Sequence, residues 1–434
     1  MGSAREAFDL SNAAPAAKLL EVPGGVRLHA RADPGCISAR ALFEGAAVFE
    51  SLLARGEQLA RVEANRALLR FVNGVDWLLR DPKSLVGRTP YEVIYRQDKL
   101  EVRRYAAGGA QPPRPYLPIL LIPPLMVKPF IYDLYPGRSM VAYLKERGFP
   151  VYLLDFGEPD AADAYVALDD YVVDWIPAAC RAVKRDAGTA ELSLLGYCMG
   201  GLFVLSHVAA NQDASVRNIV SIGAPVDMNK MGLFAWMGKL AGAQIDFLTR
   251  RIGNVPGGLS STVFRLLTPM KNVTRYADLF MNMWDREYVN GFDAMNQWVS
   301  QFIDYPQTAF LQFQQEFLRR NKLVKGQMRF AGRVADLRRV RAALLVFAGR
   351  SDQIAPPASV RAALDAVGSQ DKSFRLVSGG HMGIIAGATA PRHVWQPVAK
   401  WLSARSALTA AVARPAARVR HAARARPSAR NRRT

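Results

Sequence analysis

The sequence predicts an α/β fold: a mostly parallel central sheet, an inserted and mainly helical cap, and an N-terminal helical arm. Between residues 117 and 223, short continuous apolar runs typical of strands buried on both faces alternate with helix-compatible segments. This alternation stops over residues 226–341 and resumes at residue 342, which indicates an insertion between two strands. Before the sheet, residues 39–79 are rich in Ala, Leu, Arg and Glu with apolar residues at three-to-four spacing, and they predict a helix.

The composition favours a large, soluble, intracellular fold. The 434 residues, half of them hydrophobic, are enough to bury a substantial core. Cys36, Cys180 and Cys198 are too few and too scattered for a disulfide framework or a zinc site with paired ligands, which favours a reducing compartment. Residues 1–20 lack the apolar core of a signal peptide, and the longest apolar run, residues 116–127, is shorter than a membrane span and contains three prolines. We therefore expect a cytoplasmic protein without a metal site.

The formal net charge of +20 is unevenly distributed along the chain. Residues 405–434 contain nine arginines and no Lys, Asp or Glu, so +11 of that charge remains on the rest of the protein. Their Ala, Arg and Pro composition predicts a basic, disordered tail. Because such a tail can contact anionic surfaces through charge alone, we expect any binding of nucleic acid to be confined to it.

Changes of pattern predict the domain boundaries. Residues 1–90 form the N-terminal helical arm, which we expect to cover an edge of the core. Two short β-rich runs, residues 91–95 and 100–105, predict a hairpin that opens a catalytic domain over residues 91–404. Within it, the cap insertion at about 226–341 is rich in aromatic residues and Met, which predicts an apolar lining over the site. The alternative is that these side chains form the cap's own small core.

The remaining elements of the catalytic domain follow from apolar runs and turn signals. Strands are predicted at residues 117–122, 150–155, 192–196, 219–223, 342–348 and 374–377, and helices at 139–147, 170–184 and 393–402. The helices between consecutive strands predict β-α-β units and hence parallel order.

The segment from Leu192 to Leu205 predicts a buried strand, a sharp turn and an apolar helix. Cys198 lies in the turn between Gly196 and Gly200, at the spacing of a nucleophile elbow, in which the reactive residue occupies a strained turn that only neighbours without a Cβ can accommodate. Taken alone, this pattern is equally compatible with a buried cysteine in an ordinary strand-to-helix turn. Two residues further along the chain distinguish these interpretations.

Asp352 and His381 each follow a predicted strand, as Cys198 does, at the edge where open α/β sheets place their sites. The order nucleophile, acid, histidine is that of the α/β-hydrolase fold, which the sequence therefore predicts. In this hypothesis Cys198 is the nucleophile, His381 accepts its proton, and Asp352 orients the imidazole ring. His207, His393 and His421 are interpreted as structural or exposed.

Backbone N–H groups complete the predicted site. We expect the N–H of Met199 and, from the loop after residues 117–122, the N–H of Met126 to stabilise an oxyanion. A thioester formed on Cys198 remains reactive toward an alcohol, which favours acyl transfer over hydrolysis. The thiol, the imidazole and the carboxylate perform this chemistry without a cofactor.

With these residues in place, the chain resembles the polyhydroxyalkanoate synthases, and most closely their class III type. Gly196–Gly201 matches the lipase-like box with cysteine, Gly349–Pro356 is similar to the aspartate loop, and Gly379–Gly383 is similar to the histidine loop. Further stretches that resemble the family are Tyr132–Leu134, Val151–Phe156, Pro225–Asp227, Gly253–Gly257 and Asn321–Leu323. The likeness covers about residues 90–404.

The resemblance implies an acyltransferase that polymerises 3-hydroxyacyl-CoA into a polyester, with Cys198 accepting the acyl group and His381 activating a 3-hydroxyl. The CoA thioester is then the substrate and no separate cofactor is implied. It also implies a second synthase subunit or a homodimer, and association with the surface of polyester granules. The chain departs from the family pattern at Gln353, where histidine is usual, at Phe156, where tryptophan is usual, and in its longer arm and tail.

Two alternatives remain open at this stage. A cysteine hydrolase on the same scaffold, either an intracellular polyhydroxyalkanoate depolymerase or an acyl-CoA thioesterase, would use the same three residues and yield free hydroxy acid instead of polymer. A non-enzymatic protein that binds granules or nucleic acid would depend on the basic tail at 405–434 instead. Analysis of the reaction product separates these hypotheses.

Overall fold

The computed structural model describes residues 39–79, 86–105, 116–232, 235, 240–266 and 269–405. The chain divides into two compact units, Met1–Asn65 and Arg66–Thr434. The described part of the first unit is the beginning of helix α1 (Ala39–Leu79), whose extent agrees with the helix predicted from the sequence. Apart from Arg405, the predicted basic tail at 405–434 lies outside the described residues.

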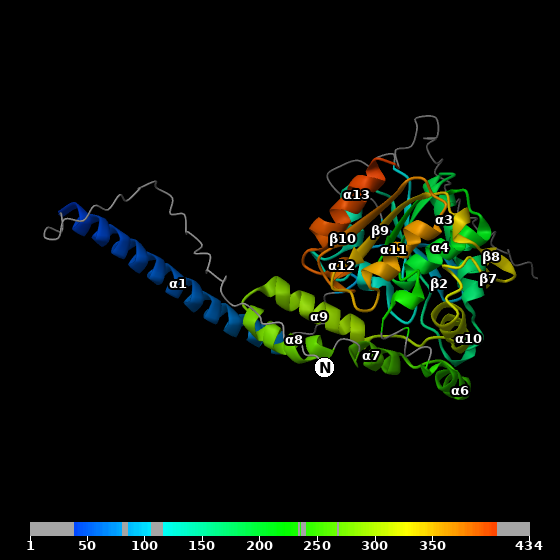
Figure 1. The fold of residues 1–434 in the computed structure, drawn as a ribbon, viewed down its shortest axis with the longest axis horizontal. Coiled ribbons are helices and arrows are strands. Elements are labelled where there is room, and N and C mark those ends of the chain that lie inside the picture. Colours follow the sequence, from blue (N-terminus) through cyan, green and yellow to red (C-terminus); the bar gives the residue numbers. More distant parts are fainter. Residues whose placement is uncertain are drawn as a thin grey trace, which may run out of the picture. The chain divides into compact units, whose positions relative to one another are not determined.

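The second unit is built on an eight-stranded sheet with the order β1-β2-β4-β3-β5-β6-β9-β10 (Figure 1). Six neighbouring strands are parallel, whereas β1 and β2 form an antiparallel hairpin whose second strand pairs antiparallel with β4. The strands are β1 (Glu92–Gln97), β2 (Leu100–Tyr105), β3 (Ile119–Ile122), β4 (Val151–Asp155), β5 (Leu192–Tyr197), β6 (Val216–Ile222), β9 (Ala343–Gly349) and β10 (Lys372–Val377). The predicted mostly parallel sheet and its opening hairpin are confirmed.

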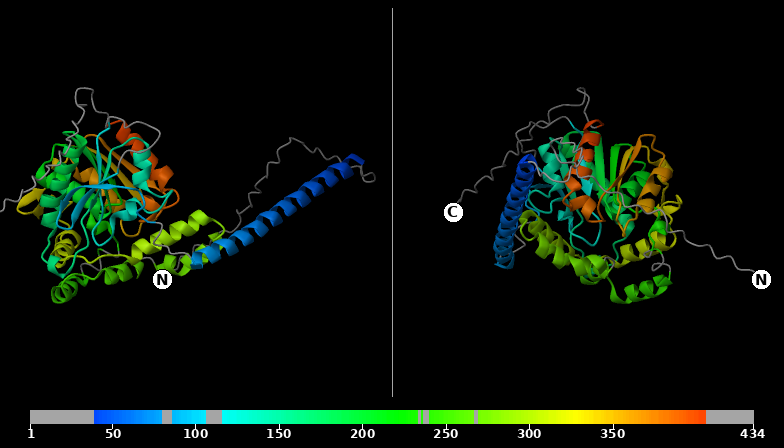
Figure 2. Two further views of the ribbon diagram at one scale, coloured as in Figure 1. Left: turned by 180° about the vertical axis from the view of Figure 1, so that it is seen from behind. Right: turned by 60° about the vertical axis from the view of Figure 1, so that its left-hand side comes forward.

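Helices cover both faces of this sheet, as two views of the ribbon show (Figures 1 and 2). Alternate residues along one strand belong to different cores: Leu120 of β3 packs with helices on one face, and Leu121 packs with helices on the other. The first face carries α3 (Ile176–Ala187), α4 (Met199–Asn211) and α11 (Pro357–Ala366), and the second carries α2 (Met140–Glu146), α12 (Gly383–Ala386) and α13 (Gln396–Ser403). Burial on both faces explains why these strands are continuously apolar in sequence.

Local signals set the ends of several helices. Ser139 caps α2, its hydroxyl oxygen accepting a hydrogen bond from the N–H of Ala142. Helix α3 ends at Gly188, whose left-handed backbone (φ +66°) terminates the helix before β5 begins. Because the strands are parallel, their carboxyl ends share one edge of the sheet, and the predicted site residues lie at this edge.

The insertion between β6 and β9 is mainly helical, as the sequence predicts. Its helices are α6 (Gly242–Ile252), α7 (Gly257–Leu266), α8 (Pro269–Asn282), α9 (Arg286–Ser300) and α10 (Gln307–Gln312). A short hairpin of β7 (Met328–Phe330) and β8 (Arg333–Ala335), which sequence reasoning did not find, precedes β9. We call the helices α6 to α10 the cap.

The part of α1 that belongs to the second unit contacts the cap. The side-chain amide of Asn73 donates a hydrogen bond to the carbonyl of Met283 at 2.7 Å. The indole N–H of Trp77 donates to Asp293 of α9 at 2.6 Å. These contacts attach the end of α1 to the cap helices. Among the described residues, no helix combines the length and the apolarity that crossing a membrane requires.

Candidate active site

Cys198 lies in a strained turn between β5 and α4. Its backbone has φ +54°, a conformation that a residue with a side chain seldom adopts. The N–H of Cys198 donates to the carbonyl of Ile222 in β6 at 2.8 Å, and its carbonyl accepts from the N–H of Gly201 at 3.0 Å. Cys198 is partly buried and packs against the edge of one hydrophobic core. The turn therefore has the geometry expected of a nucleophile elbow.

Close backbone approach explains two of the glycines around Cys198. A Cβ on Gly196 would overlap the backbone of Gly200, and a Cβ on Gly200 would overlap the carbonyl oxygen of Ile122 in the adjacent strand. These contacts are with backbone atoms, which cannot move away by changing rotamer. The elbow therefore requires glycine at both positions.

We expect Gly200→Ala to destabilise the protein by about 1–3 kcal/mol or more, because the added methyl group forces strand β3 and helix α4 apart. Urea unfolding of the purified protein measures this free energy. The matched control is Gly258→Ala in α7, where a Cβ meets no atom within 4 Å and alanine is favourable in a helix. Equal stability of the two variants would contradict the close packing of the elbow.

His381 and Asp352 meet at the ends of the last two strands of the sheet. Nδ1 of His381 lies 2.8 Å from Oδ2 of Asp352, and both side chains are buried. The other oxygen of Asp352 accepts hydrogen bonds from the backbone N–H groups of Ile354 at 2.9 Å and Ala355 at 2.8 Å. Because these donors hold the carboxylate in place, its second oxygen is directed at the imidazole ring.

The electrostatics of His381 connect it to both predicted partners. Burial of the ring disfavours its charge, but Cys198 and Asp352 together outweigh burial and raise the pKa of His381 to about 10. The structure thus brings the three predicted side chains together, and it favours the protonated form of the imidazole.

Neighbouring groups hold the imidazole ring of His381 in its position. The ring of Tyr197, the last residue of β5, lies 5.1 Å from it between ring centres, and the Tyr197 hydroxyl donates to the His381 carbonyl at 3.2 Å. On another side is Gly223, where a Cβ would lie within 3.6 Å of two ring atoms of His381. These contacts restrict the ring to the orientation that faces Cys198.

The two predicted oxyanion donors flank the elbow. Met199 is the first residue of α4, so its N–H has no acceptor within that helix. Met126 follows β3 and has φ +58°, an uncommon conformation that turns the chain sharply after the strand. Nothing in these contacts assigns the donor role, which stays a prediction for both residues.

The cap contacts this catalytic edge directly. The N–H of Ile303 donates to the carbonyl of Met126 at 3.0 Å, so a cap segment holds the loop that follows β3. The hydroxyl of the buried Tyr305 lies 3.4 Å from the sulfur of Met199. The indole N–H of Trp298 donates to the carbonyl of Lys128 at 2.9 Å. Part of the predicted aromatic lining therefore packs on the site's own loops.

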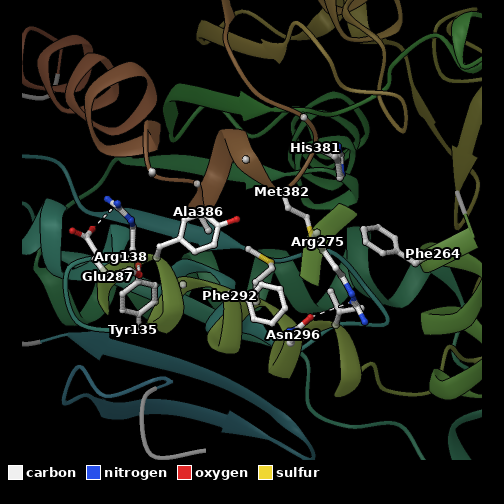
Figure 3. A pocket seen from close by; sticks show the side chains of 18 of the residues that line it. Tyr135, Arg138, Phe264, Arg275, Glu287, Phe292, Asn296, His381, Met382 and Ala386 are labelled. Carbon is white, nitrogen blue, oxygen red and sulfur yellow. Dashed lines mark hydrogen bonds and ion pairs between the residues drawn. The ribbon is translucent and has the colours of Figure 1, made fainter. Parts of the chain in front are cut away.

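A cavity of about 440 Å³ lies between the cap and the loop that carries His381 (Figure 3). His381 and Met382 form part of its wall, opposite side chains of α9 such as Phe292. Helices α7 and α8 complete the wall, with Arg275 among the lining residues. Sequence reasoning missed the polar residues of this cavity, because no spacing in the sequence shows which cap side chains face His381.

A second grouping of Cys, His and Asp side chains lies elsewhere in the fold. Cys180 of α3, His207 of α4 and Asp213 place one ligand atom each within 4.8 Å of one another. Nε2 of His207 is 3.2 Å from Asp213 and 4.0 Å from the sulfur of Cys180. Burial raises the pKa of the Cys180 thiol, which is not on a strained turn. This grouping therefore lacks the reactive thiol of a nucleophilic site.

The departures from the family pattern lie beside the three predicted residues rather than among them. Gln353 follows Asp352 with its side chain exposed. Phe156 packs edge-to-face on Tyr171, with 4.9 Å between ring centres, in an aromatic cluster of the core. Neither substitution alters the contact between Asp352 and His381. The third histidine of the catalytic domain, His393, is not part of this contact: its Nδ1 lies 3.1 Å from the hydroxyl oxygen of Ser378.

Comparison with known proteins places this geometry in a family. The sequence profile of the alpha/beta hydrolase fold matches residues 129–388. The poly(3-hydroxyalkanoate) polymerase subunit PhaC of Haloferax mediterranei is 34% identical over 324 residues, which are 74% of this chain and 65% of that protein. The subunit of the same name from Allochromatium vinosum is 30% identical over 335 residues, which are 76% of this chain and 93% of that protein.

Among solved structures, a soluble variant of monoglyceride lipase from Saccharomyces cerevisiae matches 75% of this chain and 98% of its own, at 14% identity and a TM-score of 0.48. The chain spans slightly less than two thirds of the Haloferax relative and nearly all of the Allochromatium relative. The fold profile and the sequence identity agree with the architecture of the sheet and cap. The chain therefore belongs to the poly(3-hydroxyalkanoate) polymerase PhaC family, on the α/β-hydrolase fold.

Proposed function

We propose that this protein is an acyltransferase that polymerises 3-hydroxyacyl-CoA into a polyester and releases CoA. The observation that carries the proposal is the connection of a cysteine on a strained elbow to a buried histidine–aspartate pair. Cys198 is the nucleophile, His381 the acid and base, and Asp352 the group that orients the ring. Membership of the PhaC family supports the choice of substrate.

In the acylation step, the thiolate of Cys198 attacks the carbonyl carbon of the substrate thioester. The oxyanion that forms is stabilised by the N–H groups of Met199 and Met126. When the tetrahedral intermediate collapses, the bond to the CoA sulfur breaks, and His381 gives its proton to that leaving group. The products are an acyl thioester on Cys198 and free CoA.

In the elongation step, the 3-hydroxyl of an incoming 3-hydroxyacyl-CoA attacks the thioester on Cys198. His381, neutral after the first step, removes the hydroxyl proton as the new ester bond forms and the thiolate of Cys198 leaves. The chain, now one unit longer and still a CoA thioester, then reacts with Cys198 again and releases CoA. Each added unit therefore releases one CoA, and the proposed cycle requires no separate cofactor.

The cap explains why transfer competes with hydrolysis. Water and a 3-hydroxyl are both oxygen nucleophiles, so the outcome depends on which of them reaches the acyl thioester. Buried aromatic residues such as Trp298 and Tyr305 cover the loops beside Cys198. We propose that this apolar cover excludes water and holds the acyl chain.

Partners and location follow from the same chemistry. Because the growing chain returns to Cys198 as a thioester after each addition, an insoluble product keeps the enzyme at the surface of its granule. The Haloferax and Allochromatium relatives are named as subunits of a polymerase, which supports a second polypeptide or a second copy of this chain as partner. We propose a cytoplasmic, granule-associated enzyme.

We expect the purified protein, supplied with 3-hydroxybutyryl-CoA, to release CoA and produce turbidity. Thiol release is followed with a chromogenic disulfide, and the product is extracted and sized. The expected product is a polyester with one CoA released per unit. CoA release that yields only monomeric hydroxy acid, without turbidity, would identify a thioesterase and reject the synthase.

A further inference from the structure

The cavity next to His381 contains charged groups that the proposed mechanism does not use. Arg138 and Arg275 both line it and lie on different sides of Phe292 in Figure 3. Two carboxylates, Asp285 and Glu287, belong to the same wall. What these arginines bind depends on whether the carboxylates already neutralise them.

Both carboxylates are already engaged by other groups. Glu287 forms an ion pair with Arg138, with 2.5 Å between Oε1 and the guanidinium nitrogen. Asp285 caps helix α9, its carboxylate accepting from the N–H groups of Glu287 at 2.9 Å and Tyr288 at 3.3 Å. Arg138 therefore has an anionic partner inside the cavity.

Arg275 has a different set of contacts. Its guanidinium donates to the amide oxygen of Asn296 at 3.3 Å and to the hydroxyl of Tyr276 at 2.9 Å, and it lies 4.6 Å from the Tyr276 ring centre. These partners are neutral. Its Nε is buried and has no hydrogen-bond partner among the residues that the structure describes. A guanidinium has five N–H donors in a rigid fork that fits two oxygens of one anion, and the two neutral partners of Arg275 accept from only two of these donors.

We infer that Arg275 binds a phosphate group of the CoA moiety of the acyl-CoA substrate, an inference that rests on the proposed function. The pantetheine arm and the polyester are uncharged, so the phosphates are the anions that this substrate brings into the cavity. Met382 lies between His381 and Arg275 in Figure 3, and Phe292 belongs to the same wall, so apolar side chains that suit the neutral arm line this cavity. The thioester then lies at His381 while the fork of Arg275 holds phosphate oxygens.

The experiment compares three substrates that carry the same 3-hydroxybutyryl group: its CoA thioester, its 3′-dephospho-CoA thioester, and its N-acetylcysteamine thioester, which has no phosphate. We expect Arg275→Gln to raise KM for the CoA thioester about tenfold to a hundredfold, the range of a lost charge-assisted hydrogen-bond pair. Turnover of the N-acetylcysteamine thioester is expected to stay within about twofold of wild type. Sensitivity of the dephospho substrate assigns the contact to the diphosphate, and its insensitivity assigns the contact to the 3′-phosphate.

Two matched variants accompany Arg275→Gln. Arg275→Lys keeps the charge but not the fork, so its KM is expected to lie between those of wild type and Arg275→Gln. Arg251→Gln removes another cap arginine, one that stacks on Phe247 outside the cavity, and is expected to leave KM unchanged. Equal losses of Arg275→Gln on the CoA and N-acetylcysteamine thioesters would overturn the inference, because the defect would then not involve phosphate.

A binding measurement separates this inference from the proposed function. In protein that also carries Cys198→Ala, the Kd for CoA itself is measured by calorimetry, and Arg275→Gln is expected to weaken it by the same factor as KM. If wild type polymerises none of the substrates, the proposed function fails, but the calorimetric comparison still decides the role of Arg275. An unchanged Kd for CoA in correctly folded Arg275→Gln protein would reject that role.

Discussion

Cys198→Ala is expected to lower the rate of CoA release by at least about 10⁴-fold, because no other group in the site can form the acyl thioester. Mass spectrometry of wild type mixed with a slight excess of 3-hydroxybutyryl-CoA should detect an acyl adduct on the tryptic peptide that contains Cys198. The variant should show no adduct. Its stability should change by no more than about 1 kcal/mol, since Cys198 is only partly buried and the change removes a single sulfur atom.

The chain supplies its own control for this result, because Cys180 also lies beside a histidine and an aspartate. Cys180→Ala is expected to cost about 1 kcal/mol of stability through lost packing in the core. It should leave the acyl adduct and the rate of CoA release unchanged within about twofold. An adduct on Cys180, or loss of activity in Cys180→Ala without unfolding, would reject Cys198 as the nucleophile.

Asp352→Asn is expected to lower the rate of polymerisation on the order of a hundredfold to ten-thousandfold. One oxygen of Asp352 is held by the N–H groups of Ile354 and Ala355, so the amide oxygen of asparagine should stay there. The amide NH₂ then faces Nδ1 of His381, which must become an acceptor. The imidazole proton moves to Nε2, and the ring can no longer accept a proton on the side of Cys198.

The same variant should change the pH dependence of thiol reactivity. The Asp352 carboxylate is one of the groups that raise the pKa of His381 to about 10, so its removal lowers that pKa. The imidazolium that stabilises the thiolate is then lost at a lower pH, and alkylation of Cys198 by iodoacetamide at neutral pH should slow. An alkylation profile that does not shift toward alkaline pH would contradict the coupling of the three groups.

Asp213→Asn is the matched control for Asp352→Asn, since Asp213 is also paired with a histidine. Burial of Asp213 works against its charge, but hydrogen bonds from His207 and Ser215 outweigh burial and hold the pKa of Asp213 well below its usual range. Replacement of Asp213 should therefore lower stability at neutral pH. It should not shift the alkylation profile of Cys198.

Much of the architecture could be read from the sequence because each signal is local. Burial on both faces makes strands such as β5 continuously apolar, and the steric requirement of the elbow explains the glycines at 196 and 200. Cys198, Asp352 and His381 each lie in the turn or loop that follows a strand, so their positions could also be predicted from the strand pattern. Each of these signals depends on a few consecutive residues and can therefore be recognised in the sequence.

Local sequence pattern was insufficient for very short elements and for contacts between residues that are distant in sequence. The hairpin of β7 and β8 is only three residues per strand, too short to give an alternation, and it was not predicted. The contact of the cap with Met126 depends on Ile303, which is separated from it by most of the catalytic domain. The environment of Arg275 likewise depends on how α8 packs on α9.

The sequence by itself determined the fold class, the elbow and the identity of the three residues proposed for catalysis, because backbone sterics and strand burial restrict which residue types can occupy those positions. Only the tertiary structure showed that Cys180, His207 and Asp213 form a second Cys, His and Asp grouping, and that Arg138 pairs with a carboxylate whereas Arg275 donates to Asn296 and Tyr276. The reason is physical: reactivity and charge compensation depend on distances between side chains of different elements, and those distances exist only once the elements have packed.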